Sequence, residues 1–474
     1  MNLLLLDPFE VAKEYPETLT NSLQYGHSRF LKFNKKGDYL ASGLLDGSIC
    51  IFDADTNQVI AVLKQHTGVV QSLEWSNCGR YLLSSSTDCK VLLWDLKTKT
   101  VIREIIFESA VWTAQLHPTN TFVFVCTIFN DDPVYVDWSN ENDIRILKIP
   151  TTPYQPEQSL TSDKNEDGDK HIEEPEPKKQ KKSKDLAFCV KFAYNGKLMF
   201  MGTNKGWLNI ISNFDNSSWL KTIYSQKICS SHAKQIVISE KTSKIFVNCS
   251  DRIIRQLSIH EDFITKYLKN PSEPTKDEGK SEDSEASGAS ATENNENDEF
   301  EIELKYQDVV NRLQWNSITI NHNGEYLIAS TYGSGAHDIY MWETTMGSLT
   351  KVLEGPKEEL FDIDWNNKRC CIGANGLDSG YVYLWTNIIP QKWSALAPDF
   401  VEIEENVEYS EQEDEFDILP NEEINQRQLN EEDEHVDIIT KDEVDARGLQ
   451  EEESFVIPMI LKKDIDLSDG EDVD

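Results

Sequence analysis

The chain has 474 residues, and its 83 Asp and Glu outweigh 46 Lys and Arg to give a formal net charge of −37. So large a negative charge argues against DNA binding by the chain as a whole. Hydrophobic residues make up 39% of the sequence and include 11 Trp, enough for a large core diluted by polar tracts. The four leucines at residues 3–6 are too few for a signal peptide, and no other apolar run could span a bilayer, so we expect a soluble, non-secreted protein.

The nine cysteines are the first candidates for bound chemistry. They are odd in number and form no C-x-x-C pair. That pattern argues against a disulfide framework and against a thiolate metal site. We therefore expect a reducing, intracellular compartment and no metal or other cofactor.

Three segments of the chain share one local pattern, at residues 33–43, 75–85 and 320–330. Each ends an apolar strand, makes a polar turn that closes on Gly, and begins a second short apolar strand. Glycine supplies the positive φ that such a turn needs. In the first two units, residues 46–53 and 88–95 follow as a hairpin turn and a strand of β-branched and aromatic residues. The sequence therefore predicts a repeated antiparallel unit.

The aromatic residue that closes the unit gives the period of the repeat. Phe52, Trp94 and Trp138 are 42 and 44 residues apart, and Trp342 and Trp385 are 43 apart. A repeat of about 40–45 residues with Gly and Trp-Asp punctuation is typical of WD40 propeller blades. The third and fourth of these aromatics are 204 residues apart, and this distance, less two polar insertions, leaves room for three more units. We therefore predict an all-β fold, a seven-bladed WD40 β-propeller.

We expect the propeller to occupy residues 1–390 and to carry two disordered insertions in its loops. Residues 153–185 and 269–302 are poor in apolar residues and cannot bury enough surface to offset the loss of chain entropy. We place the first between blades 3 and 4 and the second between blades 5 and 6. The first ends in five lysines within residues 178–184, which are either a nuclear-import signal or a solvated charge run that balances the acids before it.

One blade carries four residues that resemble a catalytic set: His66, Ser84, Asp88 and Trp94. A Ser, a His and an Asp in one neighbourhood suggest a hydrolase triad, but the chain lacks the G-x-S-x-G nucleophile elbow. Their spacing matches the structural hydrogen-bond tetrad of a WD40 blade, so we expect them to stabilise that blade. The sequence contains no Gly-rich phosphate loop, zinc-binding helix or catalytic acid pair. Because propellers bind partners through their loops, we predict a binding platform and no enzyme activity.

The acidity of the chain is concentrated in two segments. Residues 391–474 contain 29 acidic and 6 basic residues, and residues 269–302 contain 11 and 3. These segments carry −31 of the net charge of −37, so the predicted propeller is only mildly acidic and could still present a basic face to DNA. In the tail, the apolar residues Phe400, Val407 and Phe416 are spaced through acidic ones. That composition fits a segment that folds on binding a basic surface and, equally, a solubilising tail.

The tail also contains a series of short motifs. Residues 393–400 read W-S-A-L-A-P-D-F, followed by E-N-V-E-Y at 405–409 and E-F-D-I at 415–418. Directly after a seven-bladed propeller, this series closely resembles the retinoblastoma-binding protein five family and its yeast-type counterpart. Members of that family are propeller subunits of COMPASS or MLL-type histone H3 lysine 4 methyltransferase complexes. Residues 251–255 and 308–312 also resemble the family.

The resemblance implies a nuclear, non-catalytic scaffold whose partners are a SET-domain methyltransferase subunit, a SPRY-domain subunit, a second WD40 subunit and the nucleosome. The residues that would activate the SET domain are Pro398, Asp399, Phe400, Glu404, Asn406, Val407 and Tyr409. Those that would bind the SPRY subunit are Glu413, Glu415, Phe416, Asp417 and Ile418. Those that would bind the second WD40 subunit are Glu434, Val436, Asp437 and Ile438, although His435 stands where we expect an acidic residue. Arg252 and Arg255 are candidates to contact nucleosomal DNA phosphates, histones or ubiquitin, with support of the blade as the alternative.

Two other functions stay open from the sequence. The propeller could be a substrate receptor of a ubiquitin ligase, although no helical motif for the ligase machinery flanks the blades. The acidic tail could belong to a histone chaperone that neutralises basic histones by charge. A chaperone would tolerate scrambling of residues 398–418 at constant composition, whereas an assembly motif would not.

Overall fold

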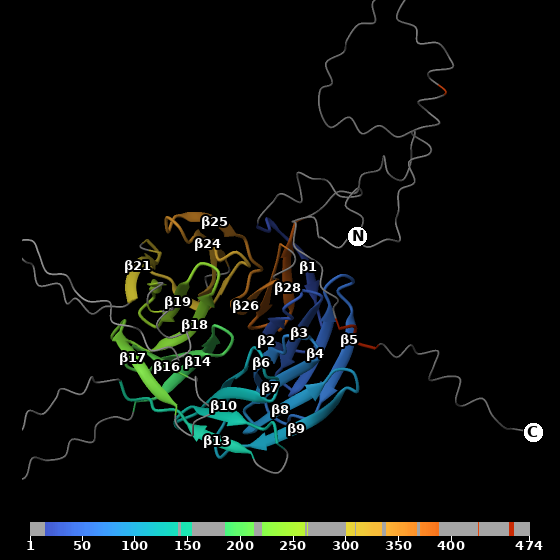
Figure 1. Cartoon of the computed structure of the whole chain (residues 1–474). Coiled ribbons are helices and arrows are strands. Elements are labelled where there is room, and N and C mark those ends of the chain that lie inside the picture. Colours follow the sequence, from blue (N-terminus) through green and yellow to red (C-terminus); the bar gives the residue numbers. More distant parts are fainter. Residues whose placement is uncertain are drawn as a thin grey trace, which may run out of the picture.

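The strands of the computed structural model form seven four-stranded antiparallel sheets, arranged as a closed ring around a central axis (Figure 1). Each sheet is one blade, and its strands are termed A to D from the axis outward. The predicted seven-bladed, all-β propeller is confirmed. The structure describes residues 15–140, 144–153, 185–212, 220–260, 263, 300–308, 310–333, 338–366, 370–387, 425 and 455–458.

The strand bounds follow the chain blade by blade. Blade 1 contains β2 (Ser28–Phe33), β3 (Tyr39–Leu44), β4 (Ser48–Asp53) and β5 (Val59–Lys64); blade 2 contains β6 (Val70–Trp75), β7 (Tyr81–Ser86), β8 (Lys90–Asp95) and β9 (Thr100–Ile106). Blade 3 contains β10 (Val111–Leu116), β11 (Val123–Ile128), β12 (Val134–Asp137) and β13 (Arg145–Lys148); blade 4 contains β14 (Ala187–Ala193), β15 (Leu198–Thr203), β16 (Trp207–Ser212) and β17 (Lys221–Lys227). Blade 5 contains β18 (Ala233–Ser239), β19 (Lys244–Cys249), β20 (Ile254–Ile259) and β21 (Phe300–Tyr306); blade 6 contains β22 (Gln314–Ile320), β23 (Tyr326–Tyr332), β24 (Ile339–Glu343) and β25 (Leu349–Leu353). Blade 7 contains β26 (Leu360–Asn366), β27 (Cys371–Gly376), β28 (Val382–Thr386) and β1 (Thr18–Leu23).

The turn between strands A and B explains why the repeated sequence pattern forms a blade. Four of these turns close on a glycine with φ between 73° and 81°: Gly37, Gly79, Gly196 and Gly324. Side chains are disfavoured in that region, which is why the pattern requires Gly. In three blades the residue that opens the turn also accepts the N–H of the first residue of strand B: Asn34 for Tyr39, Ser76 for Tyr81, and Asn321 for Tyr326.

The ring is closed by the first strand of the chain. β1 pairs antiparallel with β28, from Thr18 opposite Thr386 to Leu23 opposite Val382. The Thr20 hydroxyl donates to the Leu384 carbonyl oxygen at 3.1 Å, across 364 positions of sequence. Blade 7 therefore cannot form until both ends of the propeller have been brought together.

The core fills the spaces between neighbouring blades. The five periodic aromatics of the sequence are all buried there: Phe52, Trp94, Trp138, Trp342 and Trp385. Nearer the axis, side chains of the A strands bond the backbone of the next blade. Asp364 accepts the N–H of Phe33 at 2.7 Å and pairs with Lys32 at 2.8 Å. These directional bonds fix each blade against its neighbour, which the hydrophobic contacts alone would not do.

The two insertions lie in loops of different kinds. Residues 154–184 fall between β13 and β14, hence between blades 3 and 4 as predicted. Residues 264–299 fall between β20 and β21, which belong to the same sheet. The prediction that this insertion separates blades 5 and 6 is therefore wrong. The error arises from β21, an edge strand in which Phe300 and Tyr306 are buried while Glu301 and Glu303 are exposed. The first part of this strand therefore resembles a continuation of the acidic insertion.

The strand order places the loops on two faces of the ring. Strands A and C run in one direction and strands B and D in the other. The A–B and C–D turns therefore lie on one face, which we call the AB face. The B–C turns and the loops between blades lie on the opposite face, here the BC face.

Candidate functional site

The four residues of the predicted tetrad meet in blade 2. His66 lies in the loop before β6, Ser84 on β7, Asp88 in the B–C turn and Trp94 on β8. His66 Nδ1 is 2.9 Å from Asp88 Oδ2, and His66 Nε2 is 2.8 Å from Ser84 Oγ. Trp94 Nε1–H donates to the same Ser84 oxygen at 2.9 Å. The bonds form one chain from a carboxylate near the surface to an indole in the core.

Burial decides what this chain of bonds can do. Burial lowers the pKa of His66, only partly opposed by Asp88, so the imidazole is neutral near pH 7 and donates its Nδ1–H to the carboxylate. Partial burial alone would raise the pKa of Asp88, but His66 and two backbone N–H groups hold it below its usual value. The Ser84 hydroxyl is fully buried and already bonded to His66 and Trp94. Because no substrate could reach that hydroxyl, the geometry favours a structural role over a hydrolase triad.

Arg252 and Arg255, the candidates for nucleosome contact, differ in their surroundings. Arg255 lies on β20 with 8% of its surface exposed, and its guanidinium pairs with both carboxylate oxygens of Asp251. Arg252 is exposed in the B–C turn of blade 5. Its carbonyl oxygen accepts the Trp315 indole N–H of blade 6 at 3.1 Å. Arg252 therefore offers an accessible charge on the BC face, whereas the charge of Arg255 is engaged inside its blade.

The tail residues assigned to partner subunits lie outside the described part of the chain. They are Pro398, Asp399, Phe400, Glu404, Asn406, Val407, Tyr409, Glu413, Glu415, Phe416, Asp417, Ile418, Glu434, Val436, Asp437 and Ile438. Their roles stay predictions that rest on the motifs of the sequence.

One short part of the tail, residues 455–458, lies against the propeller near blade 1 (Figure 1, red). Ile457 is only 2% exposed and belongs to a cluster of buried side chains from blades 1 and 2 that includes Tyr39 and Trp75. Its N–H donates to the Tyr39 hydroxyl at 3.2 Å. Phe455 packs against the same cluster, close to Gly79 in an A–B turn. The tail therefore returns to the AB face.

The sequence interpretation missed this contact, although a signal for it was present. Residues 455–460 read F-V-I-P-M-I, one residue after three consecutive Glu residues. An uninterrupted apolar run within a strongly acidic tail is costly to leave in water. Such a run indicates a docking segment more directly than the scattered apolar residues at 400–418 do.

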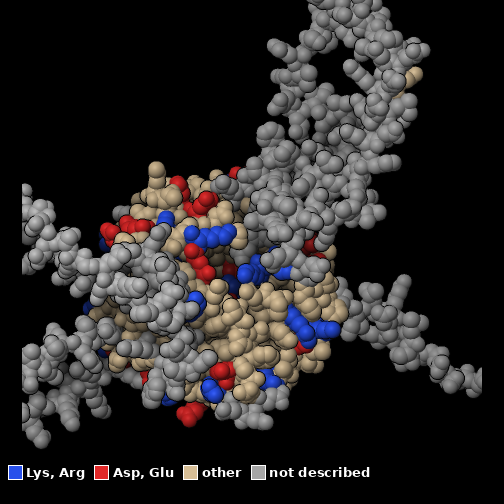
Figure 2. All heavy atoms as spheres, viewed as in Figure 1, with Lys and Arg blue, Asp and Glu red and all other residues tan. Residues whose placement is uncertain are grey.

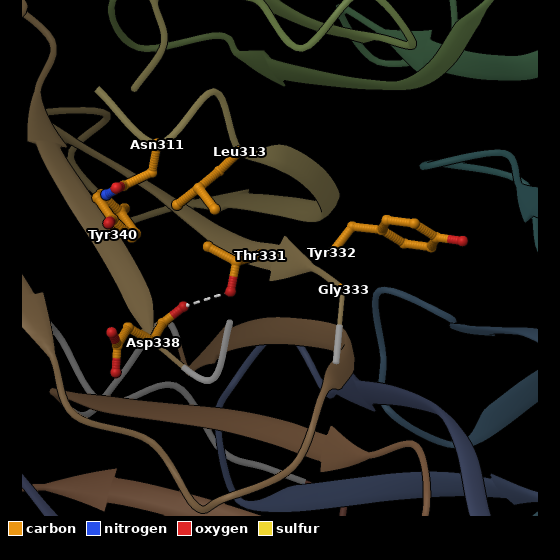
Figure 3. A pocket seen from close by; sticks show the side chains of 7 residues that line it. All are labelled: Asn311, Leu313, Thr331, Tyr332, Gly333, Asp338 and Tyr340. Carbon is orange, nitrogen blue, oxygen red and sulfur yellow. Dashed lines mark hydrogen bonds between the residues drawn. The ribbon is translucent and has the colours of Figure 1, made fainter. Parts of the chain in front are cut away.

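Two further features of the propeller surface bear on binding. Figure 2 shows basic and acidic side chains interspersed on the face in view, with no field of a single sign. A hollow of about 470 Å³ opens at blade 6, lined by Asn311, Leu313, Thr331, Tyr332, Gly333, Asp338 and Tyr340 (Figure 3). In it the Thr331 hydroxyl donates to the Asp338 carbonyl oxygen at 3.2 Å, and the Tyr340 hydroxyl donates to Asp308 at 3.2 Å. These hydroxyls are held by the blade itself, so the hollow is suited to contact and not to nucleophilic chemistry.

The described ranges offer neither a metal site nor a membrane-spanning helix. There, no three His, Cys, Asp or Glu side chains are grouped to hold a metal ion. Nor does that part of the chain contain a helix long and apolar enough to cross a membrane.

Comparison with known proteins gives a consistent set of relatives. Residues 18–53 and 57–95 match the family model "WD domain, G-beta repeat". The Set1 complex component swd1 of Schizosaccharomyces pombe is 39% identical over 88% of this chain and 90% of its own length. The COMPASS component SWD1 of Saccharomyces cerevisiae is 39% identical over 90% of this chain and 89% of its own. Among solved structures, the Cps50 (Swd1) β-propeller domain of Myceliophteria thermophila is 34% identical with a TM-score of 0.63, covering 78% of this chain and 99% of that domain.

Proposed function

The chain belongs to the Swd1 family of Set1-complex components, and from this membership we propose that it is a non-catalytic scaffold and activating subunit of a COMPASS-type histone H3 lysine 4 methyltransferase complex. One observation carries the proposal. The alignments to the two Swd1 relatives cover 88% and 90% of the chain, more than residues 1–390 can hold, so the similarity extends into the acidic tail. A propeller fold alone would leave the function open, because one fold serves many functions.

The tail segment 398–418 is proposed to join the SET-domain and SPRY-domain subunits. Its acidic residues would meet basic groups on the partners, and Phe416 would fill an apolar pocket as an anchor. Holding a flexible catalytic domain in its productive arrangement raises turnover by preorganisation, without any reacting group from this chain.

Residues 434–438 are proposed to bind the second WD40 subunit. Several weak motifs on one chain raise the effective concentration of each partner once the first is bound. The segment 455–458 supports this arrangement, because its contact with blades 1 and 2 holds the far end of the tail beside the propeller.

The nucleosome is proposed to meet the BC face, in the nucleus. Arg252 supports this part of the proposal because it is exposed there. The localisation of −31 charges in the two acidic segments removes the electrostatic objection, since the remaining propeller carries little net charge. A charge-reversal variant, Arg252→Glu, should lower nucleosome affinity and flatten its dependence on salt. Unchanged affinity with an unchanged salt slope would remove Arg252 from the interface.

The tail proposal is tested by methyl transfer to a histone H3 peptide in a complex reconstituted with the SET-domain and SPRY-domain subunits. We expect deletion of residues 398–418 to abolish stimulation while the propeller keeps its melting temperature. A variant with the same 21 residues in scrambled order is the matched control for charge. Loss of stimulation in both variants supports an assembly motif, whereas full activity of the scrambled chain would favour a charge-driven chaperone.

A single side chain sharpens the same experiment. We expect Phe416→Ala to weaken binding of the SPRY subunit by roughly thirtyfold or more, the effect of removing a buried aromatic anchor. Leu419→Ala is the matched control, because it removes an apolar side chain just outside the assigned residues. Equal effects of the two substitutions would contradict the assignment of Phe416.

A further inference from the structure

Blade 5 differs from blade 2 at the position of the tetrad. Cys229 follows β17 by two residues, as His66 follows β5. Asp251 follows β19 by two residues, as Asp88 follows β7. Blade 5 thus keeps the carboxylate but has a thiol where blade 2 has an imidazole. The carboxylate of Asp251 is bonded instead to the guanidinium of Arg255.

A second thiol faces the first. Cys249 is the last residue of β19, and its Sγ lies 3.3 Å from the Sγ of Cys229. Neither cysteine is in a disulfide, and both are buried. A disulfide needs the two sulfur atoms at about 2.05 Å, so closure requires them to approach by only about 1.2 Å. Because Cys229 begins an exposed loop that includes Ser230 and His232, the movement can be taken up on that side.

The surroundings give the two thiols different roles. The pKa of Cys229 is lowered to about 6, chiefly by the hydrogen bond with Cys249 and then by Ser231 and the charge of Arg255, against the effect of burial. The pKa of Cys249 is raised, chiefly by its hydrogen bond with Cys229 and then by burial. Cys229 therefore loses its proton first and is the nucleophile, since the thiolate and not the thiol is reactive. Cys249 keeps its proton and is placed to resolve the oxidised sulfur.

We propose that Cys229 and Cys249 form a peroxide-sensitive modification site, at which a reversible disulfide links the loop between blades 4 and 5 to β19. The Cys229 thiolate attacks one oxygen of hydrogen peroxide, the O–O bond breaks, hydroxide departs, and Cys229 becomes a sulfenic acid. The Cys249 sulfur then attacks the Cys229 sulfur, the S–O bond breaks, and the S–S bond forms with release of water. The two thiols lose two electrons, and the peroxide takes these and two protons to become two waters.

The disulfide should stabilise the propeller. It closes a loop from residue 229 to residue 249, which removes conformations from the unfolded chain. The oxidised protein should therefore melt at a higher temperature than the reduced protein. A thiol reductant should reverse the shift.

Peptide mapping of the full-length protein tests the proposal directly. Trypsin cuts after Lys227, Lys234, Lys244 and Arg252, so the two cysteines fall on separate peptides, 228–234 and 245–252, with one cysteine each. After hydrogen peroxide and blocking of free thiols, we expect these two peptides to be joined, at a mass two hydrogens below their sum, and dithiothreitol to separate them. Complete blocking of both thiols, under conditions that oxidise the exposed Cys78, would overturn the proposal. So would equal cross-linking in urea-unfolded protein, because the pairing would then owe nothing to the fold.

Variants separate the two thiols. With Cys249→Ser we expect the joined peptides and the rise in melting temperature to disappear, and Cys229 to stop at a sulfenic acid that dimedone traps. Cys78→Ser is the matched control and should leave the pair unchanged. Absence of a dimedone adduct on Cys229 in folded Cys249→Ser protein would contradict its role as the nucleophile. If that variant does not fold, the mapping of the unsubstituted protein decides alone.

Discussion

The contact of the C-terminal segment with blades 1 and 2 makes a sharp prediction for Ile457→Ala. Ile457 is 2% exposed, whereas its neighbour Val456 is 72% exposed. The substitution removes the apolar side chain from the cluster and leaves the backbone N–H that donates to Tyr39. The matched control Val456→Ala shortens a side chain on the same segment without touching the cluster.

The size of the effect follows from the burial. Truncation of a buried Ile to Ala costs about 2–5 kcal/mol in a closed core. For a segment that can leave the surface, the lower part of that range applies, about 2–3 kcal/mol, because the emptied site can be filled by water or by neighbouring side chains. At 1.4 kcal/mol for each factor of ten, the ratio of docked to undocked segment should fall by a factor of about 30 to 140.

Hydrogen exchange at the amide of residue 457 measures this ratio, because the amide is protected only while it is bonded to Tyr39. We expect its protection to fall by the same factor in Ile457→Ala, while amides within β3 and β6 keep theirs. Val456→Ala should change protection by less than about threefold. Retained protection at residue 457 in the Ile457 variant, or an equal loss in both variants, would falsify the docked arrangement.

Three further predictions concern the body of the propeller. His66→Ala should lower the free energy of unfolding by about 1–3 kcal/mol, because Ser84 and Asp88 lose a buried hydrogen-bonding group. Binding of partner subunits should be unchanged, and loss of that binding at unchanged stability would contradict the structural role. The pKa of His66 is lowered from 6.5 in the folded state, so only the unfolded chain takes up this proton as the pH first falls below 6.5, and stability present above that pH should be lost below it. His66→Asn should flatten this decline, measured by urea unfolding at pH 7 and pH 5.5. An equally steep decline in the variant would assign the effect to another group. Gly47→Ala should destabilise the fold more than Gly333→Ala. Both glycines have positive φ, 87° and 124°, but a Cβ at Gly47 would meet the His66 carbonyl oxygen, whereas a Cβ at Gly333 would lie in open space. Equal losses in melting temperature would refute the steric argument.

The number of blades could be predicted from the sequence because its signals are local. A turn glycine such as Gly79 and a core aromatic such as Trp94 each act within one blade, and their spacing survives insertions elsewhere. The tetrad geometry could be anticipated for the same reason. Pairings between distant segments could not be predicted, because the sequence of β1 contains no feature that identifies β28 as its neighbouring strand. The contact of Ile457 with Tyr39 is equally non-local, across 418 positions.

The pairing of Cys229 with Cys249 escaped the sequence for another reason. Close spacing of cysteines in the sequence indicates a pair, whereas here the loop before blade 5 and the B strand of that blade bring together cysteines that are 20 positions apart. Only alignment of blade 5 on blade 2 shows that Cys229 stands at a histidine position. That alignment needs the strand bounds, because the middle blades lack the periodic closing aromatic that marks the others.

The two faces of the ring suggest how one small scaffold could serve several partners at once. The chain leaves the propeller after β28, whose C-strand direction ends on the AB face, and returns to that face at Phe455 beside Gly79. The intervening residues 388–454, which hold the proposed motifs and most of the negative charge, therefore start and finish on one side. Arg252 lies in a B–C turn on the other side. A nucleosome on the BC face would then lie on the opposite side of the ring from the two points where the tail meets the propeller, and at physiological salt the repulsion between like charges is screened beyond about 8 Å. The negative charge of the chain is thus compatible with work on chromatin, provided that the tail stays anchored on the AB face.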